Sequence, residues 1–241
     1  MAEPVLSLRG LRKRFGALAV TDGVDLDIAP GELHAVIGPN GAGKTTLVNL
    51  VSGILRPDAG TIRFCDADVT QMPVHARAKR GLARSFQITS VLAGFSVREN
   101  VVLAAQARGR ASEFALNAQA EAALEQVGIR DRAELPAGHL SHGEKRALEL
   151  AMALAGEPKL LLLDEPMAGT GHDEAARLIA LLQSLKGRFP IVLVEHDMAA
   201  VFALADRVSV LIYGRVLASG TPEAVRADPR VREAYLGEDM E

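Results

Sequence analysis

A glycine-rich run after a short apolar segment leaves few folds open to this chain. The run is Gly38-Pro39-Asn40-Gly41-Ala42-Gly43-Lys44-Thr45, followed by Thr46, and it fits the pattern G-x-x-x-x-G-K-[ST]. Such glycines let backbone N–H groups converge on phosphate oxygens, and the helix that follows points its positive end at the same place. In this pattern the lysine reaches the outer phosphates and the Thr45 hydroxyl binds Mg²⁺. The sequence therefore predicts a phosphate-binding loop between a strand at Leu33–Ile37 and a helix that begins near Lys44.

A second run of four leucines ends in two carboxylates, as Leu160-Leu161-Leu162-Leu163-Asp164-Glu165-Pro166. In a parallel sheet, a buried strand of this kind ends at the edge where ligands bind. Adjacent strand residues point to opposite faces, so the two carboxylates can have different roles. We expect Asp164 to hold Mg²⁺ and Glu165 to accept the proton of an attacking water.

The rest of the chain alternates short apolar strands with helical stretches, which favours an α/β fold with a largely parallel sheet. From about Gly81 to Gly156 the chain is rich in alanine and poor in strand signals, which indicates an inserted helical subdomain. We expect one domain over residues 1–241, with 1–80 and 157–241 as a nucleotide-binding core and 81–156 as the helical subdomain. The other expected strands are Val5–Leu8, Val24–Ile28, Lys159–Leu163, Ile191–Val194 and the hairpin of Arg207–Tyr213 with Val216–Ser219.

Composition and charge exclude several classes of protein. The chain has 241 residues, a formal net charge of −3 and one cysteine, Cys65. A chain this long buries a core without disulfides or a structural metal. The mild charge gives no electrostatic reason to expect nucleic acid as a partner. We interpret the basic clusters as solvated surface; they are Arg12-Lys13-Arg14 and Arg77-x-Lys79-Arg80 with Arg84 beyond.

The apolar runs are strand-sized, and none is long enough to span a membrane. The first residues also lack the charged-then-apolar pattern of a signal peptide. We expect a cytoplasmic protein that reaches a membrane only by docking on a partner.

Three more features share the order and spacing of a known family. The first is the segment Leu140-Ser141-His142-Gly143-Glu144, which precedes the strand that ends in Asp164-Glu165. The second is Gln87, which lies between the phosphate loop and that strand, and the third is His196, which ends a later strand. Over essentially the whole chain, this pattern resembles the nucleotide-binding subunit of an ABC transporter. The resemblance implies a P-loop NTPase (RecA-like) core with an N-terminal antiparallel β layer and an inserted α-helical subdomain.

The resemblance also implies the cofactors ATP and Mg²⁺ and a set of site residues. Gln87 would sense Mg²⁺ and the γ-phosphate, His196 would be the switch histidine, and Phe15 would stack on adenine. Phe15 could instead pack within the N-terminal β layer. The signature Ser141, His142, Gly143 and Glu144 would face the ATP of a partner subunit.

The signature departs from the commonest family pattern, which has Gly and Gln where this chain has His142 and Glu144. Ser141-x-x-Glu144 is also a capping box, so the change preserves the helix start while adding a negative charge near a phosphate site. The family usually has an Asp or Asn shortly after the Asp-Glu pair, but the matching stretch here, Met167–Gly171, contains neither.

Four short segments are similar to the ATPases of branched-chain amino acid importers and their urea-importing relatives. They are Ser85-Phe86-Gln87, Glu195-His196-Asp197-Met198, Gly220-Thr221-Pro222 and Arg232–Gly237. The likeness implies a motor subunit on the cytoplasmic face of the inner membrane. It would act as a homodimer, or as a heterodimer with a second ABC ATPase, beneath two permease subunits and indirectly with a solute-binding protein.

Several alternatives remain open from the sequence. The cargo could be urea, or lipid or lipopolysaccharide in an exporter. A soluble ABC-type ATPase acting on ribosomes or DNA, or a P-loop phosphotransferase, fits less well. We expect the permease to dock on an apolar patch with a charged rim: Ile88, Val91, Leu92 and Phe95, with Arg98 and Glu99 beyond. The same side chains could instead pack within the helical insert.

Overall fold

A computed structural model describes residues 3–84, 91–107, 109 and 111–236. The chain divides into two compact units. The first unit contains Met1–Arg77 and Leu185–Glu241, and the second contains Ala78–Ser184. The second unit therefore includes residues 157–184, which the sequence pattern groups with the nucleotide-binding core.

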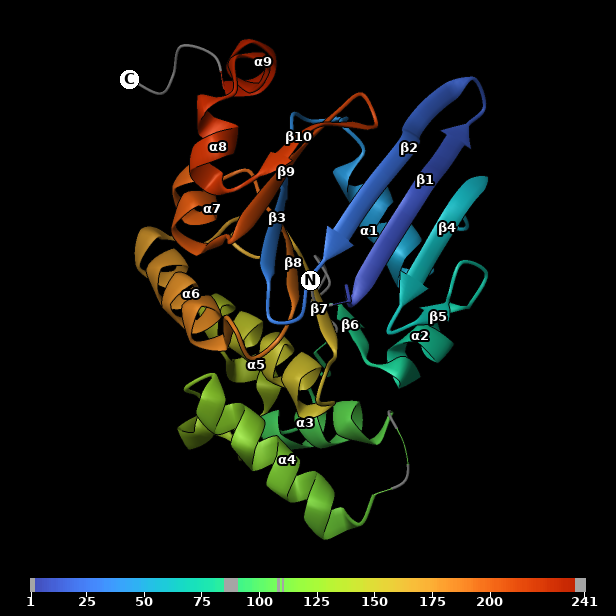
Figure 1. Ribbon diagram of the computed structural model, residues 1–241. Helices are drawn as coiled ribbons and strands as arrows, with labels where there is room; N and C mark the ends of the chain where they lie inside the picture. The colour runs from blue at the N-terminus through green and yellow to red at the C-terminus, as the bar shows by residue number, and fades with distance from the viewer. Residues whose placement is uncertain (1–2, 85–90, 108, 110, 237–241) are drawn as a thin grey trace. The chain divides into compact units, whose positions relative to one another are not determined.

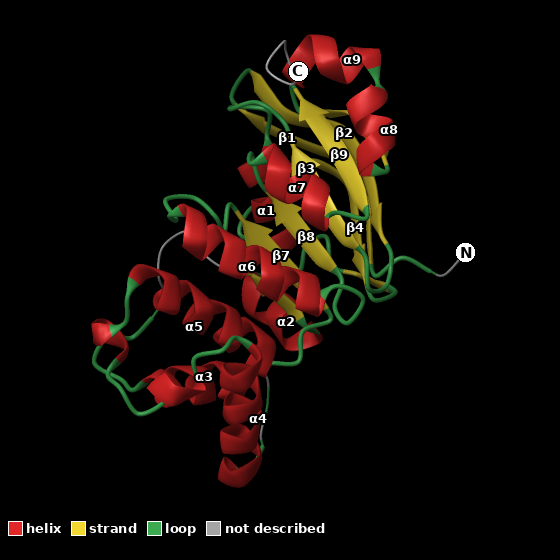
Figure 2. Cartoon of the chain, turned by 90° about the vertical axis from the view of Figure 1, so that its left-hand side faces the viewer, coloured by secondary structure: helices red, strands yellow, loops and turns green. Residues whose placement is uncertain are grey.

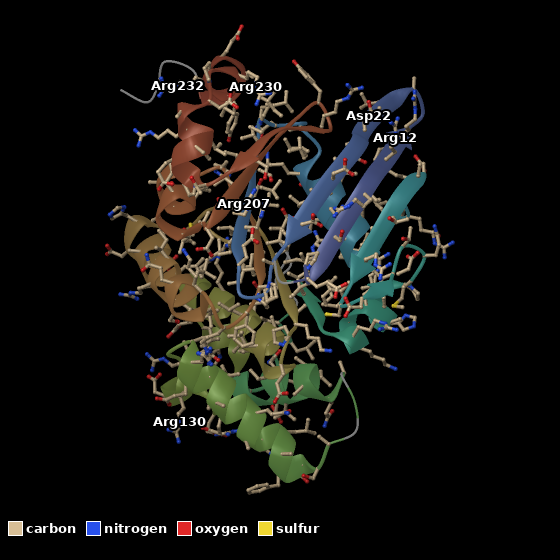
Figure 3. The ribbon with its side chains drawn as sticks, in the orientation of Figure 1. Arg12, Asp22, Arg130, Arg207, Arg230 and Arg232 are labelled. Atoms are coloured by element: carbon tan, nitrogen blue, oxygen red, sulfur yellow. The ribbon has the colours of Figure 1, made fainter. Side chains whose placement is uncertain are left out.

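An antiparallel layer opens the first unit, as the family resemblance predicts (Figure 1, blue to cyan). Its strand order is β2-β1-β4-β5. The strands are β1 (Leu6–Phe15), β2 (Leu18–Ile28), β4 (Ala59–Phe64) and β5 (Ala67–Asp68). The first two are longer than the sequence predicts because their pairing continues through charged residues. Arg12 of β1 pairs with Asp22 of β2, and a 2.8 Å ion pair joins their side chains (Figure 3).

The parallel strands of the first unit carry the phosphate loop. β3 (Leu33–Ile37) runs parallel to both β8 (Ile191–Val194) and β9 (Arg207–Ile212), and β10 (Arg215–Gly220) returns antiparallel to β9. Every residue of β3 and β8 is buried, as expected for strands covered on both faces. The helices are α1 (Lys44–Ser52), α2 (Val74–Arg80), α7 (Met198–Leu204), α8 (Pro222–Ala227), α9 (Pro229–Val231) and the turn η3 (Arg232–Leu236).

A chain of polar side chains crosses β3 and β9 near the start of β3, at the opposite end of that strand from the phosphate loop. Glu32 Oε1 lies 2.6 Å from His34 Nδ1, and His34 Nε2 lies 2.8 Å from Ser209 Oγ, which donates to Ser219. Burial raises the pKa of Glu32, but hydrogen bonds from His34 and the Ala29 N–H outweigh it and lower that pKa below its usual value. The buried charge is therefore stabilised by specific partners rather than by solvent.

Arg77 is a buried cation beneath the helix of the phosphate loop. It is 1% exposed and donates to the carbonyls of Leu50 and Val51 at the end of α1, and to those of Thr70 and Met72. Burial lowers its pKa to about 10, so it stays charged at neutral pH. A cation at this place adds hydrogen bonds to the last carbonyls of the helix and complements the helix dipole. The interpretation of Arg77 as solvated surface is therefore wrong, because its guanidinium is buried and hydrogen-bonded to these carbonyls.

The second unit combines a short parallel strand pair with helices (Figure 2). β6 (Leu82–Arg84) pairs with β7 (Leu160–Asp164). α3, α4 and α5 pack against one another through apolar residues such as Val101, Leu124 and Leu148, which confirms a helical insert. The helices are α3 (Val97–Gln106), α4 (Glu113–Gln126), α5 (His142–Ala155), α6 (His172–Leu185) and the short turns η1 (Arg130–Arg132) and η2 (Ala137–His139). Among the described residues, no helix has the length and apolar character needed to cross a bilayer.

Arg77→Met should lower the free energy of unfolding by roughly 2–4 kcal/mol, because several buried carbonyls lose their donor at once. Urea denaturation measures the change. Arg80→Met, at an exposed position of the same helix α2, is the matched control and should change stability by less than about 0.5 kcal/mol. Equal midpoints for the two variants would contradict the structural role of Arg77.

Candidate functional site

The phosphate loop has a backbone conformation that favours glycine. Gly38, Gly41 and Gly43 have φ angles of 151°, 80° and 103°, in the region that L side chains rarely enter. A Cβ at Gly38 would lie 2.1 Å from the Leu211 carbonyl oxygen, and one at Gly43 would lie 2.4 Å from that of Val20. The loop is therefore held between backbone segments, in the form that a cradle for phosphate oxygens requires.

Hydrogen bonds tie this loop to its surroundings. Lys44 Nζ donates to the carbonyls of Gly38 at 2.6 Å and Pro39 at 3.1 Å, so its ammonium lies over the loop. The Gly214 N–H, in the turn between β9 and β10, donates to the Ala42 carbonyl at 3.0 Å. Thr45 and Thr46 lie in the first turn of α1, and Thr45 is exposed.

Tyr235, near the C-terminal end of the described chain, also reaches the loop. Burial raises the pKa of its phenol, and the Gly38 N–H that hydrogen-bonds to the phenol oxygen opposes that shift. The sequence singles out Arg232–Gly237 as a subfamily marker and misses this contact. An aromatic residue in a short C-terminal helical turn gave no signal that it would meet a loop 197 positions earlier in the chain.

Two further predicted residues belong to the first unit. Phe15 ends β1 with 49% of its surface exposed, and the Lys13 ammonium lies 5.7 Å from its ring centroid. His196 follows β8 with an exposed side chain. Because Val36 pairs with Val194 in the parallel ladder, the phosphate loop and His196 leave the same edge of the sheet.

The two predicted carboxylates of the second unit lie in different backbone settings. Asp164 ends β7 with a side chain that is 0% exposed, and Arg84 donates to its Oδ2 at 3.0 Å. Glu165 lies beyond the strand with φ 50°, a left-handed conformation. The alternation of strand side chains therefore does not set its direction, contrary to the sequence argument. Pro166 follows and disfavours the ordinary helical conformation at Glu165.

The signature begins α5 through a complete capping box, as predicted. The Glu144 N–H donates to Ser141 Oγ at 3.3 Å, and the Ser141 N–H donates to the Glu144 carboxylate at 2.8 Å. That backbone bond and the Arg132 side chain, 3.0 Å away, lower the pKa of Glu144. Arg132 thus compensates the charge that Glu144 adds in place of the family's glutamine.

A cavity of about 310 Å³ adjoins this helix start. Ser141 and Gly143 line it together with Glu174 of α6, while His142 is exposed in the same first turn. The next segment, at Met167–Gly171, is held by Arg146, which donates to the carbonyls of Pro166 and Ala168. Gln87 and Ile88 lie outside the described residues.

Arg84, like Arg77, is largely buried rather than part of the solvated surface that the charge pattern predicts. Its side chain is 10% exposed and bonded to Asp164. The available signal was its place after the apolar Leu82-Ala83, three positions before Gln87.

Three features define a P-loop NTPase: parallel strands on either side of β3, the glycine-rich loop after β3, and the buried carboxylate of Asp164. Comparisons with known proteins specify the family. The family described as "ABC transporter" matches residues 21–168. The chain is also 37% identical over 254 residues to the "High-affinity branched-chain amino acid transport ATP-binding protein LivG" of Escherichia coli (strain K12), covering 99% of this chain and 100% of that protein. The chain belongs to the ABC transporter family, as its ATP-binding and ATP-hydrolysing subunit.

Three further comparisons concern the subfamily, a relative in an exporter and the fold. The family described as "Branched-chain amino acid ATP-binding cassette transporter" matches residues 215–241. The "Lipopolysaccharide export system ATP-binding protein LptB" of Escherichia coli (strain K12) is 34% identical, over 98% of each chain. A solved ATP-binding cassette of an ABC transporter in its ADP conformation is 28% identical with a TM-score of 0.89, covering 98% of this chain and 100% of that one.

Gly43→Ala should weaken the binding of fluorescently labelled ADP by at least about tenfold. The new Cβ meets a backbone carbonyl, and the left-handed φ adds strain of roughly 1–3 kcal/mol. Gly41→Ala is the matched control, because it has the same φ problem but no neighbouring atom within 4 Å. Equal affinities for both variants would show that the close approach at Val20 does not matter.

Proposed function

We propose that the phosphate loop binds the phosphates of ATP through its backbone and Lys44, and that Phe15 stacks on the adenine. The glycine cradle between Val20 and Leu211 is the observation that carries this proposal. It is supported by the solved relative in its ADP conformation. In this site Glu165 is the general base, with His196 and Gln87 as further catalytic groups.

Mg²⁺ fits the donors that the chain offers. Asp164 supplies a buried carboxylate and Thr45 an exposed hydroxyl, and hard cations prefer such oxygen ligands. Gln87 is the third proposed ligand. The described residues contain no cluster of three or more His, Cys, Asp or Glu side chains suited to a metal ion. Mg²⁺ usually binds through one or two protein groups together with the substrate's phosphates. When bound, it neutralises charge that develops on the phosphate oxygens.

We further propose that two ATPase subunits pair head to tail, so that each presents Ser141 to Glu144 to the ATP of the other. The N-terminus of α5 is suited to this role because its backbone N–H groups attract anions. The pair is a homodimer or includes a second ABC ATPase. It acts at the cytoplasmic face of the membrane with two permeases and, indirectly, a solute-binding protein.

The cargo that the observations favour is a branched-chain or related amino acid. The full-length likeness to LivG and the C-terminal family match support it. A lipopolysaccharide exporter is the second candidate, because LptB is nearly as similar over the same length. The proposed permease surface keeps two exposed apolar side chains, Leu92 and Phe95, 42% and 46% exposed. Arg98 is paired with Glu121 and Glu134 instead of forming a free rim charge.

Glu165→Gln should retain ATP and become dimeric with Mg·ATP, while hydrolysis falls by roughly 10²–10⁴, the usual contribution of a general base. Phosphate release and size-exclusion chromatography measure the two effects. Lys44→Ala is the contrasting variant and should lose nucleotide binding. An unchanged rate in Glu165→Gln would remove that residue from the role, and normal ATP binding by Lys44→Ala would count against the phosphate-loop assignment.

The proposed class of cargo can be tested by affinity purification of this chain from gently solubilised membranes of its own cell, because the partners that co-purify identify the transporter. We expect two permeases of the amino acid importer class and a second ATPase, identified by mass spectrometry. Recovery of lipid-export partners would instead support the second candidate, a lipopolysaccharide exporter. Ribosomes, or no membrane protein, would contradict the docking surface itself.

A further inference from the structure

The register of β6 against β7 places Arg84 on the same face as Asp164. Arg84 pairs with Leu162 in the parallel ladder, and Asp164 lies two residues beyond Leu162. Side chains two apart in a strand share a face, so Leu162 and Asp164 point to the same side as Arg84. The long arginine side chain extends along the strand and ends 3.0 Å from Asp164 Oδ2.

The pair is buried on both sides. Exposed fractions are 10% for the Arg84 side chain and 0% for that of Asp164. Solvent therefore contributes little to holding the carboxylate, and a guanidinium presents donors in a fixed planar fork that limits how a carboxylate can turn. The backbone on either side is also fixed, because the Gly81 carbonyl accepts from the N–H groups of Lys159 and Leu160.

We propose that Arg84 is a positioning residue for the divalent cation: it fixes the orientation of the Asp164 carboxylate so that the metal meets a preset ligand. This rests on the proposed function, in which Asp164 holds Mg²⁺. Partners that hydrogen-bond to a ligating carboxylate fix its direction, and their loss costs 10–100-fold in metal affinity. Arg84 does not touch the reacting atoms in this scheme.

The test uses the full chain and Mn²⁺ as the probe, with ADP in excess and electron paramagnetic resonance as the readout. Arg84→Met should weaken Mn²⁺ binding by roughly 10–100-fold. Arg84→Lys should give a smaller loss, because an ammonium keeps the charge without the planar fork. Arg80→Met, an exposed arginine of the same basic cluster, is the matched control and should bind Mn²⁺ as the unmodified chain does.

ADP binding in the presence of EDTA separates positioning from folding. Positioning predicts that Arg84→Met keeps its metal-free ADP affinity and loses only Mn²⁺ affinity. A parallel loss of metal-free ADP binding would make the ion pair structural and overturn the proposal. Mn²⁺ affinity equal to or above that of the unmodified chain would overturn it as well.

Asp164→Asn distinguishes this inference from the function on which it rests. If Asp164→Asn weakens Mn²⁺ binding and Arg84→Met does not, Asp164 remains the ligand and Arg84 has no positioning role. If Asp164→Asn leaves Mn²⁺ binding unchanged, the metal assignment of Asp164 itself is wrong, and the role of Arg84 is lost with it.

Discussion

The close approach of backbone segments at the phosphate loop is the constraint on which the first unit depends. Gly38 and Gly43 lie where any side chain would displace the carbonyls of Leu211 and Val20. These carbonyls belong to β9 and β2, so the loop joins the parallel strands to the antiparallel layer. Phosphate binding therefore uses a backbone conformation that the surrounding strands already impose, and little ordering is left for the nucleotide to bring about.

Buried arginines support two of the elements that the proposed mechanism uses. Arg77 satisfies carbonyls at the end of α1, while Arg84 pairs with Asp164 at the end of β7. Each is a charge that the interior tolerates only because specific acceptors surround it. In both cases the arginine is a hydrogen-bond donor to acceptors that solvent scarcely reaches.

The sequence predicted the elements whose chemistry is local. The phosphate loop, the capping box at Ser141 and the apolar strands β3, β7 and β8 follow from spacing and periodicity alone. The length of β1 and β2 was missed because cross-strand ion pairs, not alternating apolar residues, continue the ladder. Arg77, Arg84 and Tyr235 were missed because their partners are distant in sequence or are backbone atoms, which no side-chain pattern announces.

The supports of the phosphate loop have a consequence for synthesis on the ribosome. A nascent chain that has reached residue 200 already contains the whole loop and the helix α1 behind it. It lacks Leu211, Gly214 and Tyr235, whose contacts with Gly38 and Ala42 complete the cradle. The first motif made is thus among the last to gain all its contacts, because β9 and the C-terminal turn must be synthesised before these partners of the loop exist.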